Sequence, residues 1–213
     1  MRITGGLARG IPLRLPARGE IRPATDYLRE AVFSSLGAFV EGARVLDLFS
    51  GTGAYGLEAL SRGSGAVTFV EKNPAAIAAV RANASAVQKA ILSAASHGKK
   101  PAAPCADAAP PLPRANPAPA PACDFIQQDA LRWAPPTEET YDLLFCDPPW
   151  RLWEDEAASI PEKLAHWART GPDSRIILEG PAEWQPRLPP AWREHRRLAK
   201  GKGQPSAILL RPA

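Results

Sequence analysis

A short apolar strand that runs into a glycine-rich turn constrains the fold of this chain most. Residues 44–48 (Arg-Val-Leu-Asp-Leu) are typical of a buried strand, and Gly51-Thr-Gly53 follows, ahead of a helical stretch to about Ser61. Asn73 can cap a helix from Pro74 to about Ile91. Further strands are expected at 66–71, 125–128, 141–146, 175–179 and 206–211. This alternation predicts an α/β fold with a doubly wound, mostly parallel sheet.

Two segments depart from that alternation. Residues 1–40 are expected to form an extension with strands at Arg2–Gly6 and Ile11–Pro16 and a helix from Thr25 or Asp26 to about Phe39. Residues 41–213 form the main domain. Within it, Ala or Pro fills 17 of the 22 positions 101–122, and eight prolines block helix and ladder alike. We therefore expect a flexible insertion at about 95–122.

Composition excludes several classes of protein. The chain has 213 residues, enough for one sizeable core, and no apolar run approaches the 18 residues that a membrane span needs. Its first residues lack the apolar core of a signal peptide. Three cysteines form no CxxC pair, and the three histidines stand far apart. We expect a soluble, cytoplasmic monomer without a metal site.

Charge is distributed unevenly along the chain. Residues 1–40 carry six Arg against three acidic residues, and 187–213 carry seven basic residues against one acidic residue. The segment between them holds thirteen basic and eighteen acidic residues. Basic ends around an acidic centre indicate a surface for a polyanion beside a site for another ligand. Ordinary solvated arginines on two surface segments are the alternative.

The glycine-rich turn indicates a nucleotide-like ligand. Gly51, Gly53 and Gly56 match G-x-G-x-x-G, and Glu71 lies twenty residues after Gly51, as in dinucleotide sites. Asp47 would repel a pyrophosphate, however, and would attract the ammonium and sulfonium groups of S-adenosylmethionine. Glu71 then suits the ribose, and Asp129-Ala130 lies where an adenine amine needs an acceptor. A cap or turn role for Asp129 is the alternative.

The tetrapeptide Asp147-Pro148-Pro149-Trp150 follows an expected strand and faces the same crevice as Asp47. An exocyclic amine of a nucleobase is a poor nucleophile because its lone pair is delocalised. The Asp147 carboxylate and the Pro148 carbonyl could hold both N–H groups and aim the lone pair at a methyl donor, and Trp150 could stack on an extruded base. A strand stop followed by a buried Trp is the structural alternative.

These motifs resemble the bacterial RsmD family, methyltransferases that modify the N2 amine of a guanine in 16S ribosomal RNA. The resemblance rests on Arg2–Gly6, Arg22–Asp26 with Arg29-Glu30, Asp47–Gly53 with Leu57–Arg62, Val70-Glu71, and Asp147–Trp150. It implies a class I fold with a seven-stranded sheet, the adenosylmethionine loop at Asp47–Gly53, and Arg22–Asp26 near the methionine end of that cofactor. Trp150 stands where Tyr is more usual, and the Ala/Pro insertion has no counterpart.

We therefore expect a class I methyltransferase that uses S-adenosylmethionine and acts on 16S rRNA, within the small ribosomal subunit or its precursor. The expected catalytic residues are Asp147, Pro148, Pro149 and Trp150. The expected cofactor residues are Arg22, Thr25, Asp47, Phe49, Ser50, Gly51, Gly53, Glu71, Lys72, Asp129, Ala130 and Asp147. The expected RNA contacts are Arg2, Arg9, Arg14, Arg18, Arg196, Arg197, Lys200 and Lys202, and Arg193 is a further candidate. A DNA adenine methyltransferase, an NAD-dependent oxidoreductase and a non-catalytic RNA-binding module remain as alternatives.

Overall fold

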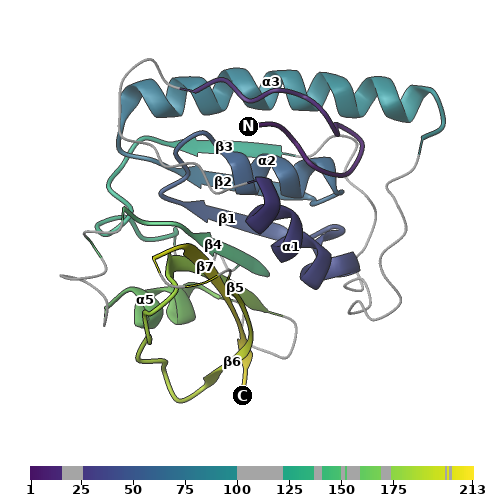
Figure 1. Ribbon diagram of the computed structural model, residues 1–213. Helices are drawn as coiled ribbons and strands as arrows, with labels where there is room; N and C mark the ends of the chain where they lie inside the picture. Colours follow the sequence, from purple (N-terminus) through teal and green to yellow (C-terminus); the bar gives the residue numbers. More distant parts are fainter. Residues whose placement is uncertain are drawn as a thin grey trace.

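The structure is a computed structural model that describes residues 1–15, 26–99, 122–136, 141–149, 152, 159–168, 174–199, 201 and 203–213. Seven strands form one sheet in the order β3-β2-β1-β4-β5-β7-β6 (Figure 1). The strands are β1 (Arg44–Leu48), β2 (Ala66–Val70), β3 (Ala122–Ile126), β4 (Leu143–Cys146), β5 (Arg175–Pro181), β6 (Trp192–Ala199) and β7 (Pro205–Pro212). Within the described residues, no helix is long and apolar enough to cross a membrane.

Strands β1 to β5 pair in parallel, and β7 is antiparallel to both β5 and β6. The order of strands reverses at β1, which lies between β2 and β4. This is the switch point of a doubly wound sheet, where the carboxyl ends of neighbouring strands leave a crevice for a ligand. The predicted doubly wound, mostly parallel, seven-stranded α/β sheet is confirmed.

Alternate side chains of each strand enter two separate cores. One core takes Val45, Phe69, Phe145 and Ile177 and is covered by α1 (Asp26–Leu36), the 3-10 helix η1 (Gly37–Val40), α2 (Ala54–Ser61) and α3 (Pro74–Ser96). The other core lies against α5 (Ser159–Trp167) and takes Leu46, Leu144, Cys146 and Leu178. Each strand therefore has a defined α2 side and a defined α5 side.

The helices expected after 25 and 53 form as predicted, and Asn73 caps α3 by accepting hydrogen bonds from Ala75 and Ala76. Helix α3 continues to Ser96, beyond the expected end. Strand β3 begins at Ala122, earlier than the expected 125. Helix α5 and strand β6 were not expected. Strand β6 was missed because it is an edge strand whose side chains are mostly charged and exposed.

The expected N-terminal hairpin forms over a short stretch, because Ile3 N–H donates to the Ile11 carbonyl over 2.9 Å and Leu13 N–H donates to the Met1 carbonyl over 3.2 Å. An isolated antiparallel bridge joins Arg2 to Pro12, around a turn. The turn of this hairpin is also fastened to α2: Thr4 N–H donates to Glu58, and Leu7 and Ala8 N–H donate to Ser61. Residues 1–15 thus contain a short hairpin whose turn is fastened along α2.

Candidate functional site

Three carboxylic acids lie at the carboxyl ends of adjacent strands, on one face of the sheet. Asp47 is in β1 opposite Phe145 of β4, and it points to the α2 side of the sheet. Cys146 pairs with Leu178, so the next residues, Asp147 and Glu179, lie side by side at the ends of β4 and β5. Because side chains alternate along a strand, Asp147 and Glu179 share the α2 side with Asp47. The sequence predicted two of these three acids.

The carboxyl groups of this cluster are drawn toward their neutral forms. Burial raises the pKa of Asp47 to about 8, and the nearby Glu71 carboxylate adds to the rise. Burial also raises the pKa of Asp147 well above its usual range, and the charges of Glu179 and Asp47 raise it further. Such a site would bind a cation in exchange for protons.

Helix α2 supplies a hydroxyl group to the third acid. The Tyr55 hydroxyl donates a hydrogen bond of 2.6 Å to Glu179 Oε2, and both residues are buried. The Tyr55 ring stacks on Phe145 with 4.8 Å between centroids, which fixes the direction of the hydroxyl. Burial raises the pKa of Glu179, and the Tyr55 hydrogen bond and the charge of Arg29 oppose that rise.

The glycine-rich loop connects β1 to α2. Gly51 and Gly53 adopt positive φ values of 54° and 77°, which favour glycine, and Phe49 also has a positive φ, 56°. Glu71 holds the loop from the end of β2, because its Oε2 accepts from Gly51 N–H and its Oε1 accepts from Asn73 N–H. Ser50 is buried, and its hydroxyl has no hydrogen-bond partner among the residues that the structure describes. The loop therefore offers an unsatisfied polar group to a ligand.

Beyond β3, Asp129 forms a local turn. Its Oδ1 accepts from Leu131 N–H, and its backbone carbonyl accepts from Arg132 and Trp133. The side chain is partly exposed, and Ala130 beside it is buried. Lys72 is exposed at the end of β2. Because Asp129 Oδ1 is used in the turn, the second carboxylate oxygen has no hydrogen bond to another described residue.

After Asp147, Pro148 is buried and Pro149 is exposed, and the Pro149 carbonyl accepts a hydrogen bond of 2.8 Å from Leu152 N–H. Both prolines have trans peptide bonds. Trp150 lies outside the described residues, as do Arg18, Arg22, Thr25, Lys200 and Lys202.

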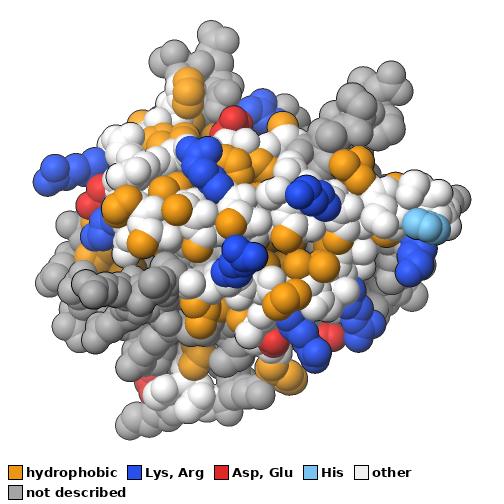
Figure 2. All heavy atoms as spheres, turned by 90° about the horizontal axis from the view of Figure 1, so that it is seen from above, with side chains coloured by type: hydrophobic (Ala, Val, Ile, Leu, Met, Phe, Trp, Pro, Cys, Tyr) orange, Lys and Arg blue, Asp and Glu red, His pale blue; other side chains and the backbone are white. Residues whose placement is uncertain are grey.

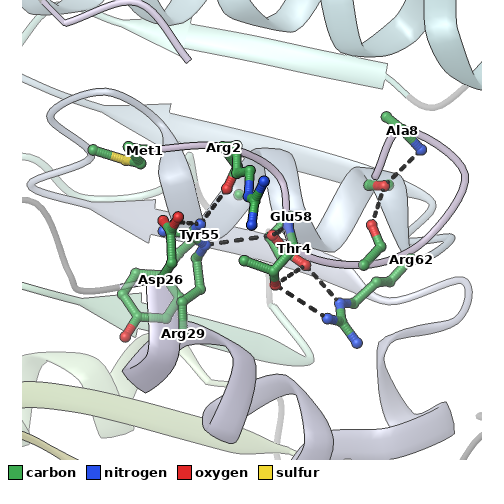
Figure 3. A network of polar contacts seen from close by, with 12 residues as sticks. Met1, Arg2, Thr4, Ala8, Asp26, Arg29, Tyr55, Glu58 and Arg62 are labelled. Atoms are coloured by element: carbon green, nitrogen blue, oxygen red, sulfur yellow. Dashed lines mark hydrogen bonds and ion pairs between the residues drawn. The ribbon is translucent and has the colours of Figure 1, made fainter. Parts of the chain in front are cut away.

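Behind the acid cluster, a buried ion pair joins α1 to α2. Arg29 is fully buried, and its Nε lies 3.4 Å from Glu58 Oε2. The guanidinium also contacts Asp26 and the Arg2 carbonyl, so it fastens the N-terminal segment to both helices (Figure 3). Its Nη1 is buried without a hydrogen-bond partner in the described part of the chain. Burial raises the pKa of both Glu179 and Tyr55, and the positive charge of Arg29 partly opposes both rises.

The expected RNA contacts fall into two areas. Arg2, Arg9 and Arg14 are exposed on the N-terminal segment, where Arg14 is held to α3 through Asn83. The other area is β6, the edge strand at the opposite end of the sheet from β3. There Arg193 and Arg196 are exposed, whereas Arg197 is bonded to Glu194 and to the Trp184 carbonyl.

The face that carries α3 is basic. Helix α3 contains Arg81 and Lys89 but no Asp or Glu. Figure 2 shows this face with basic side chains spread over it and few acidic ones among them. On β6, the pKa of His195 is lowered by partial burial and by the charges of Arg211, Arg175, Arg193 and Arg196. The face that carries α3 and strand β6 can therefore both attract a polyanion.

Sequence reasoning missed Tyr55, Glu179 and the Arg29–Glu58 pair as parts of one site. Glu179 ends an expected strand, and that position was the available signal, because ligand groups gather at strand carboxyl ends. Tyr55 carries no comparable signal, since its role depends on how α2 packs on the sheet. Among the described residues, no group of three or more His, Cys, Asp or Glu could hold a metal ion.

Comparisons with known proteins place these features in context. Residues 1–106 match the family model described as "Conserved hypothetical protein 95". The chain is 44% identical over 75 residues to ribosomal RNA small subunit methyltransferase D of Escherichia coli, covering 35% of this chain and 38% of that protein. It is 41% identical over 83 residues to the proposed rRNA methyltransferase YlbH of Bacillus subtilis, covering 39% and 45%. The matched segments span less than half of these relatives.

Solved structures extend the likeness to the whole chain. The proposed methyltransferase yhhF of Escherichia coli has a TM-score of 0.68 and 27% identity, covering 100% of this chain and 97% of that chain. The ribosomal protein L11 methylase of Lactobacillus delbrueckii, at 13% identity and a TM-score of 0.56, shares the fold. The expected class I methyltransferase fold and the resemblance to the RsmD family are both confirmed.

Proposed function

We propose that this chain, which resembles ribosomal RNA small subunit methyltransferase D, transfers a methyl group from S-adenosylmethionine to the N2 amine of a guanine in 16S rRNA. The observation that carries the proposal is that Asp47 and Asp147 lie at the ends of the neighbouring strands β1 and β4, on the α2 side of the sheet and beside the glycine-rich loop. One acid lies where a cationic donor would bind, and the other begins an Asp-Pro-Pro turn suited to an amine.

The residues at the loop fit S-adenosylmethionine by their chemistry. This cofactor supplies an activated methyl group on a positively charged sulfur. Burial raises the pKa of both Asp47 and Asp147, and neighbouring carboxylates add to the rise, so a cationic ligand would be bound with release of protons that leaves both side chains ionised. The unpartnered Ser50 hydroxyl and the backbone of Phe49, Gly51 and Gly53 would complete the cradle.

The other cofactor residues lie along the ends of the neighbouring strands. Glu71 would accept from ribose hydroxyls while it holds the loop, and Asp129 with Ala130 would flank the adenine beyond β3. Lys72 is exposed beside them. For Arg22 and Thr25, which lie outside the described residues, the proposed contact near the methionine end rests on the resemblance alone.

Asp147, Pro148 and Pro149 would position the guanine. The Asp147 carboxylate and the Pro148 carbonyl accept the two N–H groups of the amine, which leaves its lone pair pointing at the methyl group. Proline at 148 and 149 removes two backbone donors and fixes φ, so the carbonyl direction is set before the base arrives. Trp150, by its place in the sequence, would stack on the flipped base.

The substrate RNA would contact the two basic areas. Arg2, Arg9 and Arg14 present exposed charge on a segment that hydrogen bonds fasten to α2 and α3. Arg193 and Arg196 present charge on β6, while Arg197 is already bonded within the protein. Arg18, Lys200 and Lys202 would extend these areas. We propose a monomer that meets its rRNA in the cytoplasm, on the small ribosomal subunit or its precursor.

Transfer of a radiolabelled methyl group tests the function. Purified protein would be incubated with labelled S-adenosylmethionine and small subunits from a host that lacks its own enzyme, with bare 16S rRNA, or with duplex DNA. We expect label in the small subunits, and mass spectrometry of the nucleosides should find N2-methylguanosine. Methyladenine in DNA with no label in RNA would instead establish a DNA adenine methyltransferase. No transfer to any substrate would overturn the proposal.

A further inference from the structure

The Tyr55–Glu179 pair lies next to the proposed catalytic acid but has no part in the chemistry described above. Glu179 lies beside Asp147 because β4 and β5 pair in register through Cys146 and Leu178. The side chains of Asp147 and Glu179 both point to the α2 side of the sheet. Glu179 is buried, and the hydroxyl of Tyr55 donates to it over 2.6 Å. It costs folding free energy to bury a carboxylate beside another acid with only a neutral hydroxyl as its donor. The position of Glu179 therefore calls for an explanation.

We infer that Glu179, anchored by Tyr55, is a positioning residue that keeps Asp147 a strong acceptor for the protons of the substrate amine. This inference rests on the proposed methyl transfer to an amine. Glu179 does not touch the substrate; it acts through Asp147.

The charges around Asp147 support this role. Glu179 from β5 is the larger source of negative charge at Asp147, and Asp47 from β1 is the second. The Tyr55 hydroxyl of α2 and the Arg29 charge of α1 both favour the ionised form of Glu179. Cys146, beside Asp147 in the chain, faces the α5 core and stays a neutral thiol, since burial and the two aspartates raise its pKa.

In the transfer step the amine lone pair forms the new bond between nitrogen and the methyl carbon. The bond between sulfur and that carbon breaks, and its electron pair stays on sulfur. The nitrogen then carries a positive charge and loses one proton to Asp147, so the product amine and Asp147 both end neutral. A carboxylate with a higher pKa accepts that proton more readily. Glu179 raises the basicity of Asp147 by placing negative charge beside it.

Glu179→Gln tests the role, because the amide retains the shape and an acceptor for Tyr55 while it removes the charge. We expect the acid limb of the kcat profile, measured at saturating S-adenosylmethionine and RNA, to move to lower pH by about one unit. The plateau of kcat should fall about three- to tenfold, and KM for RNA should stay unchanged. Glu41→Gln, ahead of β1 at the opposite end of the strands, is the matched control and should move nothing.

Tyr55→Phe provides a second, milder variant. Without the hydroxyl, Glu179 should hold a proton over a wider range of pH, so the acid limb should move in the same direction as in Glu179→Gln. In the Glu179→Gln background, Tyr55→Phe should add no further shift, because Tyr55 acts through Glu179. A further shift of equal size in the double variant would contradict that chain of action.

A titration without any cofactor gives a readout independent of turnover. Carbon-13 NMR of the aspartate carboxyl groups, with Asp147 assigned through Asp147→Asn, should show a lower midpoint for Asp147 in Glu179→Gln than in the wild type. If Glu179 is only structural, thermal stability falls while the midpoint and the acid limb stay in place, which overturns the inference alone. If the wild type methylates no amine on any substrate, the proposed function fails, and the inference fails with it.

Discussion

The carboxylate of Asp47 accepts a hydrogen bond of 2.9 Å from the backbone N–H of Gly56, in the first turn of α2. The bond fastens the end of β1 to the helix that follows the loop and satisfies one of the free N–H groups of a helix start. Gly56 is required there for a second reason. A Cβ atom on it would lie 2.4 Å from Phe69 Cε1 and 2.8 Å from Val67 Cγ1, so α2 packs directly on β2.

Gly56→Ala should therefore destabilise the protein. The added methyl group forces α2 away from Phe69 and lengthens the bond to Asp47, and overpacking of this kind costs about 1–3 kcal/mol. Urea unfolding followed by circular dichroism measures the loss. Adding Phe69→Leu, which shortens the side chain in the way, should recover part of it. No recovery in the double variant would show that the strain lies elsewhere.

The stability of the ligand-free protein should depend on the charge state of Asp47. Its pKa is about 8 in the folded chain against an ordinary value of 3.8, so the folded state holds one more proton than the unfolded state between these values. Stability must then fall as pH rises from about 4 to 8, by up to about 1.4 kcal/mol per pH unit for one proton. Asp147 and Glu179 act in the same direction.

Asp47→Asn isolates the contribution of Asp47. The amide oxygen can still accept from Gly56, but no proton is exchanged, so the slope of stability against pH should become shallower. Thermal unfolding at pH 5, 6, 7 and 8 measures both proteins. An unchanged slope in the variant would show that Asp47 is ionised in the folded chain.

Removal of Glu58 from its buried ion pair with Arg29 should strongly destabilise the protein. Glu58→Ala leaves a fully buried guanidinium without its partner in α2, and removing one member of such a pair costs about 3–5 kcal/mol. The exposed pair of Arg197 and Glu194 is the control, and Glu194→Ala should cost less than about 1 kcal/mol. Equal losses in the two variants, measured by urea unfolding, would contradict the role of burial.

The alternation of strands and helices along the chain could be predicted from the sequence, since β1, β2, α2, α3 and β7 each carry a strong local pattern. The glycine-rich loop, Asp47 and Asp147 were also found, because turn chemistry and strand ends leave local signals. Strand β6 and α5 were missed. The alternation that marks a half-buried strand is hidden in β6 by its charged residues, and its pairing with β7 is a tertiary effect.

The partners of the site residues could not be predicted. Nothing in the sequence tells that Glu71 divides its carboxylate between Gly51 and Asn73, or that Asp47 is turned toward Gly56. The same holds for residues 1–15, where the turn of the expected hairpin also bonds to Glu58 and Ser61 of α2. The contacts of residues 1–15 join segments more than fifty residues apart, and they depend on the packing of α2 on the sheet.

Loss of Glu71 should weaken cofactor binding through the loop as well as through the ribose. Glu71→Ala removes both acceptors that hold Gly51 and Asn73, and we expect binding of S-adenosylmethionine to weaken by about 1–3 kcal/mol. Glu71→Gln retains one acceptor and should lose less. Isothermal titration calorimetry measures both, with NAD as the control ligand. Tight binding of NAD to the wild type would contradict the proposed cofactor.

The last prediction distinguishes the effect of the Arg14 charge from the effect of the hydrogen bonds that attach the N-terminal segment to α3. The Arg14 side chain is exposed, while its backbone N–H donates to Asn83 Oδ1 over 2.9 Å and its carbonyl accepts from Asn83 Nδ2 over 3.1 Å. Arg14→Ala therefore removes a charge without releasing the segment from α3. It should weaken RNA binding and flatten the dependence of log K on log salt by about one unit if Arg14 meets one phosphate.

Two controls frame that measurement, which uses filter binding to 16S rRNA across a salt series. Arg197→Ala removes an equal charge whose donors are already bonded to Glu194 and the Trp184 carbonyl, so it should change the salt slope less. Asn83→Ala keeps every charge but releases the Arg14 backbone from α3, so it should weaken binding at all salt concentrations with little change in slope. An unaltered slope in Arg14→Ala would remove the N-terminal segment from the RNA-binding surface, because a phosphate contact cannot be lost without releasing fewer counterions.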